Sequence, residues 1–255
     1  MPSPRTPATF SPIAHGGVGV PLYRVVARQL LAAVESGAMP PGSVLPNERE
    51  LAGQFGVSIG TLRQAVGELV ESHVLLRRQG RGTFVAHHDA ERFLFHFFHI
   101  ERADGLREAP EVETIRFERG RLDDEAAEAL GVRAGSAAWR IENRLRLQGR
   151  AVVLDRLQLP FMHFRGLTAK RFLERPGTIY RLYQDAFGIT VLRARERVRA
   201  VAAGADVAQA LGIARGLPVL EVRRTALTFG GRPVEYRVST VLTGAHEYVQ
   251  TLSRH

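Results

Sequence analysis

The chain has 255 residues, 45% of them hydrophobic, and its 35 lysines and arginines against 26 acidic residues give a net charge of +9. This hydrophobic content excludes wholesale disorder, and no stretch approaches the ~18 apolar residues of a membrane helix. The absence of cysteine excludes disulfides, thiolate metal sites and cysteine nucleophiles. Lys170 is the only lysine, and such an arginine bias favours phosphate or carboxylate partners, nucleic acid first.

The N-terminal part of the chain predicts three helices. Residues 1–20 have no apolar signal-peptide core, so we expect a flexible tail and a cytoplasmic protein. Hydrophobic residues between Pro21 and Gly37 recur at helical spacing. Asn47 can cap a second helix that stops at Gly56, and Ser58 can cap a third that ends near His73.

A short hairpin is predicted directly after the third helix, with strands at 74–78 and 83–86 around a glycine-containing turn at 79–82. Three short helices followed by a hairpin are typical of a winged helix–turn–helix, in which the third helix enters the major groove. The sequence therefore predicts a DNA-binding domain at residues 21–86.

Thr61, Arg63 and Gln64 lie in the first turns of the third helix, where arginine can bond guanine and glutamine can bond adenine. The hairpin adds arginines beside glycines that allow close approach to phosphate, and residues 72–88 contain no acid. The alternative is that Arg63 and Gln64 only solvate an ordinary three-helix module. The order of cap, turn, polar helix face and basic hairpin favours DNA binding.

Five motifs in this region resemble the GntR-type repressor DNA-binding domain: residues 21–23, 45–52, 55–58, 61–65 and 78–85. The resemblance, together with the side-chain chemistry, gives these candidate DNA contacts: Arg49, Ser58, Thr61, Arg63, Gln64, Arg78, Gly80, Arg81, Gly82 and Thr83. One position departs from the family, because Ile59 stands where many members carry arginine. We expect Ile59 and Gly60 to make a shape or thymine-methyl contact, or the operator to differ.

After a polar linker at 87–92, residues 93–100 are apolar on both faces and predict a buried strand. A helical segment at 125–132 then matches one at 206–213, and each is followed by a strand and a Gly-Arg hairpin turn at an offset of 81 or 82 residues. Two copies are too few for a solenoid. The repeat predicts a pseudo-symmetric α+β domain.

Residues 93–250 are similar to the effector domain of the HutC-type subgroup, which has a chorismate-lyase-like (UTRA) mixed α/β fold. This resemblance implies an effector-binding and dimerisation domain that changes DNA affinity when a small metabolite binds. The candidate effector residues are Arg144, Arg146, Asp155, Thr178, Tyr180, Glu235 and Arg237. Val241 argues against a sugar phosphate, because some members that bind one carry a polar or aromatic residue there.

Each effector candidate has an alternative. Arg144 and Arg146 share one strand face and could bind a phosphate or carboxylate, or equally could be solvated and paired with Asp155 or Glu142. By the resemblance, Thr178 is a helix cap or a ligand donor and Tyr180 a stacking wall. Glu235 and Arg237 match positions that often face the effector, and ordinary cross-strand pairing is equally expected for them.

The sequence gives no support for a catalytic or metal-binding motif. It lacks the phosphate-cradling G-x-x-x-x-G-K-[ST] and H-E-x-x-H. The pattern G-x-S-x-G occurs at residues 56–60, but between two predicted helices, whereas a nucleophile elbow follows a strand. His96 and His99 would lie on opposite faces of the predicted strand without a third ligand, so core packing or a pocket hydrogen bond is favoured over a metal site. We expect no enzymatic activity, no cofactor and no metal.

The expected protein is a transcriptional regulator, commonly a repressor, that binds a palindromic double-stranded operator as a homodimer. Residues 1–88 hold 8 arginines and 5 acids, whereas residues 89–255 hold 27 basic and 21 acidic residues. Because most of the positive excess lies in the effector half, we expect an anionic effector. The alternatives are a constitutive DNA-binding protein with a vestigial pocket and a lyase-like enzyme with an accessory DNA-binding head.

Overall fold

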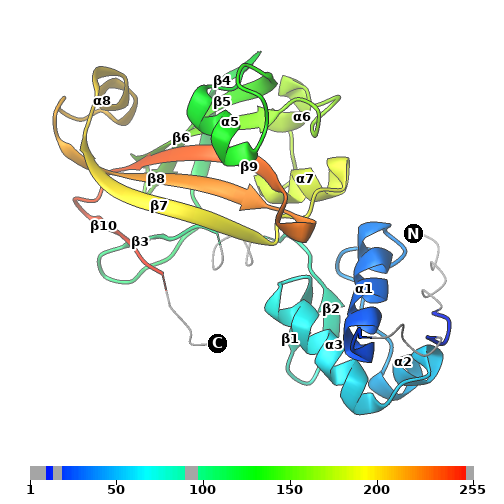
Figure 1. Ribbon diagram of the computed structural model, residues 1–255. Helices are drawn as coiled ribbons and strands as arrows, with labels where there is room; N and C mark the ends of the chain where they lie inside the picture. Colours follow the sequence, from blue (N-terminus) through cyan, green and yellow to red (C-terminus); the bar gives the residue numbers. More distant parts are fainter. Residues whose placement is uncertain (1–9, 14–18, 90–96, 251–255) are drawn as a thin grey trace. The chain divides into compact units, whose positions relative to one another are not determined.

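The computed structural model describes residues 10–13, 19–89 and 97–250. The chain divides into two compact units, Met1–His87 and His88–His255, each with its own core (Figure 1). In the described residues, none of the helices has both the length and the apolar character needed to span a membrane.

The first unit contains the three predicted helices and the hairpin, and these predictions are confirmed. The elements are α1 (Leu22–Glu35), α2 (Glu48–Phe55), α3 (Ile59–Glu71), β1 (Leu75–Arg78) and β2 (Gly82–Val85). Leu30, Phe55 and Leu62, one from each helix, are at most 1% exposed and form the centre of this core. The hairpin closes against it through Leu75 and Val85.

Local capping fixes the turn between α2 and α3. The Asn47 side chain accepts the Glu50 backbone N–H at 2.8 Å, and Ser58 Oγ accepts that of Thr61 at 3.1 Å. Gly56 ends α2 with a φ of 67°, a left-handed conformation that glycine adopts without steric cost. Both predicted caps are therefore confirmed.

The second unit is built on a six-stranded antiparallel sheet in the order β4-β5-β6-β9-β8-β7. Its main elements are β4 (Glu111–Arg121), α5 (Asp124–Leu130), β5 (Ala137–Leu147), β6 (Arg150–Pro160), α6 (Ala169–Leu173), α7 (Ile179–Phe187), β7 (Arg193–Ala202), α8 (Ala205–Leu211), β8 (Pro218–Leu227), the 3₁₀ turn η1 (Phe229–Gly231) and β9 (Pro233–Val241).

The predicted repeat is confirmed by this topology. One copy runs β4-α5-β5-β6 and the other β7-α8-β8-β9, and they meet where β6 pairs with β9 at the centre of the sheet. Both repeat helices end at a left-handed glycine, Gly131 and Gly212, 81 residues apart. The copies therefore share local structure as well as sequence.

The sheet packs on both faces because its side chains alternate. On one face, Ile141 and Leu157 pack against α6 and α7, while Val153 and Val241 pack under a small ribbon of β3 (Ile100–Arg102) and β10 (His246–Tyr248). On the other face, α5 packs against β9 and α8 against β6. Figure 1 shows α5 and α8 lying over the sheet on this second face.

The predicted strand at 93–100 is wrong where the structure describes it. Residues 93–96, His96 among them, lie outside the described residues. Phe97–His99 are not in a strand, and β3 begins only at Ile100. Phe97 and Phe98 are both buried, in two separate clusters on the same face of the sheet. An unbroken run of apolar residues indicates that the segment is buried. It does not distinguish a strand from an irregular segment whose side chains pack into two parts of the core.

The polar linker expected at 87–92 includes one residue that is buried in the second unit. His88 is fully buried, its backbone N–H donates to Gln184 Oε1 at 3.0 Å, and its ring lies 5.6 Å from that of Tyr180. The packing of the second unit therefore begins at His88.

Candidate DNA interface and effector pocket

The exposed face of α3 carries the candidate base-reading residues. Arg63 and Gln64 are exposed and Thr61 is half-buried, while the adjacent Leu62 and Ala65 are fully buried and hold the helix in place. The same helical period that buries one face therefore presents the other. Arg49 on α2 is also exposed.

Arg63 is tethered only loosely. Its Nε donates to Glu48 Oε2 at 2.7 Å, and the two side chains are 64% and 45% exposed. An exposed pair of this kind contributes about 0–1 kcal/mol. Arg63 can therefore exchange Glu48 for a base edge at little cost.

The start of α3 combines polar and apolar groups. The Ser58 and Thr61 hydroxyls lie 2.9 Å apart, and Ser58 also caps the helix, so its side chain already has a structural role. Ile59, the departure from the family pattern, is 39% exposed at the first residue of the helix. An exposed methyl-rich side chain there is suited to contact with a thymine methyl group.

The hairpin presents the second basic group of candidate contacts. Gly80 and Gly82 have φ values of 69° and 107°, which glycine adopts without strain. Arg78 lies 5.5 Å above the Phe84 ring, Arg81 is exposed, and Thr83 is half-buried. The glycines therefore set the backbone conformation of the hairpin tip, and Arg78 and Arg81 place positive charge beside it.

The candidate effector residues fall on opposite faces of the sheet. Asn143 pairs with Asp155 across β5 and β6, so Asp155 lies on the face away from Arg144. Arg144 Nε and Arg146 Nη2 each lie 3.4 Å from Glu113 Oε2 on β4. The two arginines are therefore paired, but with Glu113 instead of Asp155 or Glu142.

Asp155, Tyr180, Glu235 and Arg237 form one buried cluster beneath α7. Arg237 Nη1 donates to Asp155 Oδ2 at 3.0 Å, and its Nε donates to Glu235 Oε1 at 2.9 Å. The hydroxyl of Tyr180 donates to Glu235 at 3.3 Å, and that of Tyr183, which sequence reasoning missed, donates at 2.6 Å. Every one of these side chains is at most 6% exposed.

The cluster keeps Arg237 charged in a dry environment. Burial alone would lower the pKa of Arg237, but Glu235 and Asp155 outweigh burial and hold it well above its usual value. Burial, reinforced by Glu235, raises the pKa of Tyr180 to about 12, so this hydroxyl stays a donor. Among the described residues, the buried Arg237 Nη2 nitrogen has no hydrogen-bond partner.

Beside the cluster lies a small cavity of about 30 Å³. Its polar lining comes from Asp155, Arg237, Ser239 and Arg224, and its cover from Phe97–Ile100 and Tyr248. Sequence reasoning missed Arg224, whose only signal was an inward position on a strand that is otherwise largely apolar. A metabolite pocket occupies ~300 Å³ or more, so a ligand must displace part of this lining.

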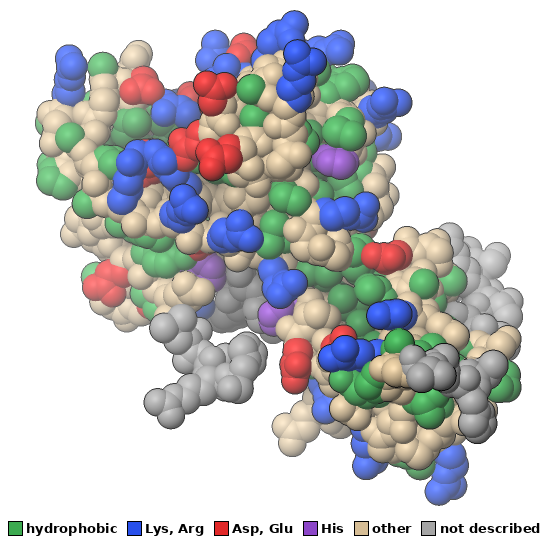
Figure 2. Space-filling view, viewed as in Figure 1, with side chains coloured by type: hydrophobic (Ala, Val, Ile, Leu, Met, Phe, Trp, Pro, Cys, Tyr) green, Lys and Arg blue, Asp and Glu red, His purple; other side chains and the backbone are tan. Residues whose placement is uncertain are grey.

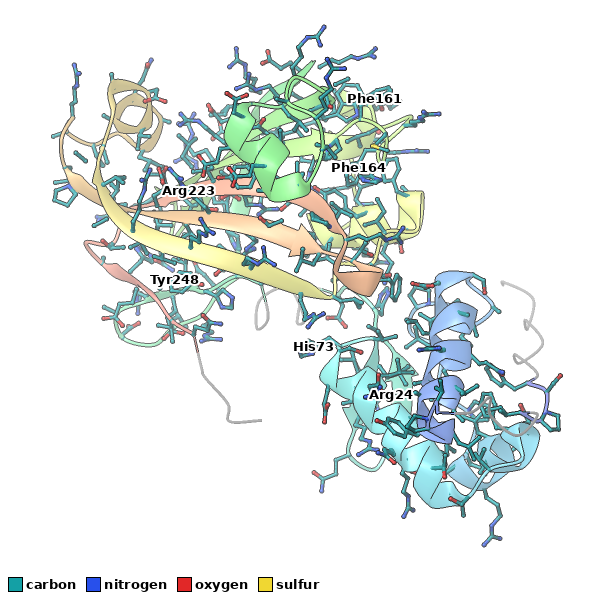
Figure 3. All side chains as sticks on the ribbon, in the orientation of Figure 1. Arg24, His73, Phe161, Phe164, Arg223 and Tyr248 are labelled. Atoms are coloured by element: carbon teal, nitrogen blue, oxygen red, sulfur yellow. The ribbon has the colours of Figure 1, made fainter. Side chains whose placement is uncertain are left out.

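Arg224 ties the cover to the sheet. It is 7% exposed, and it donates to Glu196 on β7 and to the backbone carbonyl of Phe97. Tyr248 of β10, labelled in Figure 3, donates to the same Glu196. Two polar contacts therefore fasten the cover to the sheet, Arg224 to the Phe97 carbonyl and Tyr248 to Glu196.

Two further predictions concern Thr178 and the histidines. Thr178 is the cap of α7, where it accepts the Arg181 backbone N–H at 3.2 Å, and it does not line this cavity. The His99 ring lies 5.4 Å from that of Tyr248. In the described parts of the chain, no three His, Asp or Glu side chains are grouped to hold a metal ion.

Two protein-family models match the chain. The one described as bacterial regulatory proteins, gntR family, matches residues 22–85, and the UTRA domain matches residues 106–246. The ligand-binding domain of a GntR-family transcriptional regulator from Bordetella bronchiseptica is 34% identical, with a TM-score of 0.58 over 62% of this chain and 98% of that chain. The observed folds of both units thus agree with the expected fold class.

Curated relatives resemble almost the whole chain. The HTH-type transcriptional repressor NagR of Bacillus subtilis is 30% identical over 92% of this chain and 96% of its own. The histidine utilization repressor of Pseudomonas aeruginosa is 32% identical over 87% and 88%. These relatives are regulators and not enzymes. The chain belongs to the GntR family of transcriptional repressors, with an N-terminal GntR helix–turn–helix domain and a C-terminal UTRA effector-binding domain.

Proposed function

We propose that this protein is a homodimeric repressor that binds a palindromic operator and releases it when a small anionic metabolite occupies the UTRA domain. The observation that carries the proposal is the arrangement of the first unit. A capped α3 presents Arg63 and Gln64 beside exposed Arg49 and a basic glycine hairpin. One short helix contacts few base pairs, and a two-fold dimer doubles the number of base pairs that are contacted.

In this proposal each exposed group has a defined role. Arg63 reads a guanine and Gln64 an adenine, while Thr61 contacts a base or a phosphate. Arg49 and the hairpin residues, from Arg78 to Thr83, position the unit on the sugar–phosphate backbone. Ser58 fixes the start of the helix and can also meet a phosphate.

The DNA contacts are tested with an operator selected from a random duplex library by the full-length protein, and affinities are measured by fluorescence anisotropy. Arg49→Ala and Arg63→Ala should each abolish operator binding and change the free energy of unfolding by no more than about 1 kcal/mol, because both side chains are exposed. Arg165→Ala, an exposed change in the second unit, is the matched control. Wild-type affinity in both variants would show that the contacts are assigned wrongly.

For the effector, we propose that a carboxylate or phosphate oxygen binds Arg237 Nη2, which has no hydrogen-bond partner among the residues that the structure describes. The metabolite displaces part of the cover and favours one arrangement of the protein. It can shift operator affinity only by as much as it prefers that arrangement.

A thermal-shift screen over amino acids, organic acids and sugar phosphates should find a ligand that stabilises the full-length protein and weakens operator binding. Ser239→Ala, which alters the cavity and leaves the Arg237 ion pairs in place, should weaken the response. Arg144→Gln with Arg146→Gln should leave it intact, and loss of response there would move the effector to the other face of the sheet. No stabilisation by any compound would favour a constitutive DNA-binding protein.

Dimerisation is tested separately by analytical ultracentrifugation of the full-length protein. We expect a dimer, and a hydroxyl-radical footprint with two symmetric half-sites. A monomer bound to a single half-site would contradict the homodimer and the palindrome while leaving the DNA contacts of one unit intact.

A further inference from the structure

Edge strand β7 carries an arginine row, Arg193, Arg195, Arg197 and Arg199, at every second residue. Between them, Glu196 turns to the other face, where it binds Arg224. Because side chains alternate along a strand, the four arginines lie on one face, about 6.8 Å apart from one to the next. The row therefore spans roughly 20 Å.

The arginine row is exposed and largely without acidic partners. All four side chains are exposed, and only Arg199 has an ion-pair partner among the described residues, Glu221 at 2.8 Å. The helices on this face pack against the central strands β6 and β9. Figure 2 shows blue side chains along the line that β7 follows in Figure 1.

The neighbouring strand shows that the row is not an ordinary set of ion pairs. Arg223 on β8, labelled in Figure 3, is opposite Arg197 and is bound by Glu221 at 2.7 Å as well as by Glu125 of α5. Glu221 and Glu125 are thus engaged by Arg223 and Arg199. The remaining charge of Arg193, Arg195 and Arg197 is available to a partner.

We infer that the arginine row is a second, sequence-independent contact surface for the phosphate backbone of duplex DNA. Phosphates recur every 3.4 Å of helix axis along each strand, so a row of about 20 Å runs past roughly six of them. Arginine binds phosphate through paired N–H groups. β7 does not carry a group of side chains arranged to read base edges next to these arginines, so the contact would be independent of sequence. This surface goes beyond the operator contacts of the first unit and does not depend on them.

The test compares two variants of the full-length protein with equal charge. One is Arg193→Gln with Arg195→Gln and Arg197→Gln. The control is Arg133→Gln with Arg165→Gln and Arg215→Gln, three exposed arginines scattered over the second unit. The affinity for a random-sequence duplex is measured from 50 to 300 mM salt. Each lost phosphate contact reduces the slope of log K against log salt by about 0.9.

We expect the row variant to lower the slope by roughly 2 to 3 relative to the control, with the preference for operator over random DNA unchanged. Equal slopes in the two variants would overturn the inference. Binding of the row to anionic lipid vesicles without any change in DNA binding would also overturn it. Equal slopes accompanied by new self-association would show that the arginines instead prevent the edge strand from pairing with other chains. Failure of the proposed function would appear instead as no operator preference in the wild type.

Discussion

The two units use arginine in opposite ways. In the GntR unit, Arg63 is 64% exposed and shares one exposed ion pair with Glu48, 15 residues away in the chain. In the UTRA unit, the Arg237 side chain is 6% exposed and is held by Asp155 and Glu235. Exposed pairs exchange partners at little cost, whereas a buried charge left alone costs several kcal/mol. We therefore expect that the proposed DNA contacts can be changed without loss of folding, and that the buried cluster around Arg237 cannot.

The largest expected effect follows from breaking the buried cluster. Arg237→Ala leaves Asp155 and Glu235 buried without their cation and should lower the free energy of unfolding of the UTRA unit by about 3–5 kcal/mol. Urea denaturation followed by circular dichroism measures it. Arg63→Ala is the matched control and should change stability by no more than about 1 kcal/mol. Similar losses in both variants would remove the contrast between the units.

A smaller effect is expected for base recognition. Gln64→Ala should cost about 1–3 kcal/mol of binding to the operator and relax the preference at one base pair, because a two-point contact to adenine is lost. Anisotropy with operators substituted at each position measures both. A loss that is uniform over all operators would assign Gln64 to the backbone instead.

The double role of Ser58 can be separated by two substitutions. Ser58→Ala removes the cap of α3 and should lower the free energy of unfolding of the GntR unit by about 1 kcal/mol. Ser58→Asp keeps a capping oxygen but adds a negative charge near the phosphates, so we expect stability to be retained and operator affinity to fall. If Ser58→Asp binds as tightly as the wild type, Ser58 lies away from the DNA.

The smallest effect concerns acid stability. Burial would raise the pKa of Glu196, but Arg224 and the Tyr248 hydroxyl outweigh it and lower the pKa below 4.5. The unfolded chain therefore binds this proton more readily, so Glu196 stabilises the fold above pH 4.5 and loses that contribution as the pH falls through its folded pKa. Glu196→Gln should make the fall in unfolding free energy below pH 4.5 shallower. An unchanged acid profile would contradict this assignment.

The elements of the GntR unit and the repeat of the UTRA unit were predictable from the sequence because their signals are local. Asn47 and Ser58 bond backbone groups three residues away, and a glycine ends each repeat helix. Such contacts form within a single turn, so the identity of a few neighbouring residues is enough to specify them.

The composition of the buried cluster around Arg237 was only partly predictable. Asp155, Tyr180, Glu235 and Arg237 were expected to be functional. Apart from the contact of Glu235 with Arg237, however, their mutual contacts join residues 55 and 82 positions apart. Arg224 and Glu196 belong to no motif that the sequence shows. The alternation of side chains along β5 does not reveal how β5 is aligned with β6, so it could not show that Arg144 faces away from Asp155.

The sequence by itself determined which segments form helices and hairpins, which residues cap them, and that the second half contains two related copies. Tertiary structure alone decided that Phe97 and Phe98 fill two clusters, that Glu113 binds Arg144 and Arg146, and that one nitrogen of Arg237 has no partner in the described part of the chain. The reason is that strand register brings distant residues together, and register is set by the packing of the whole sheet.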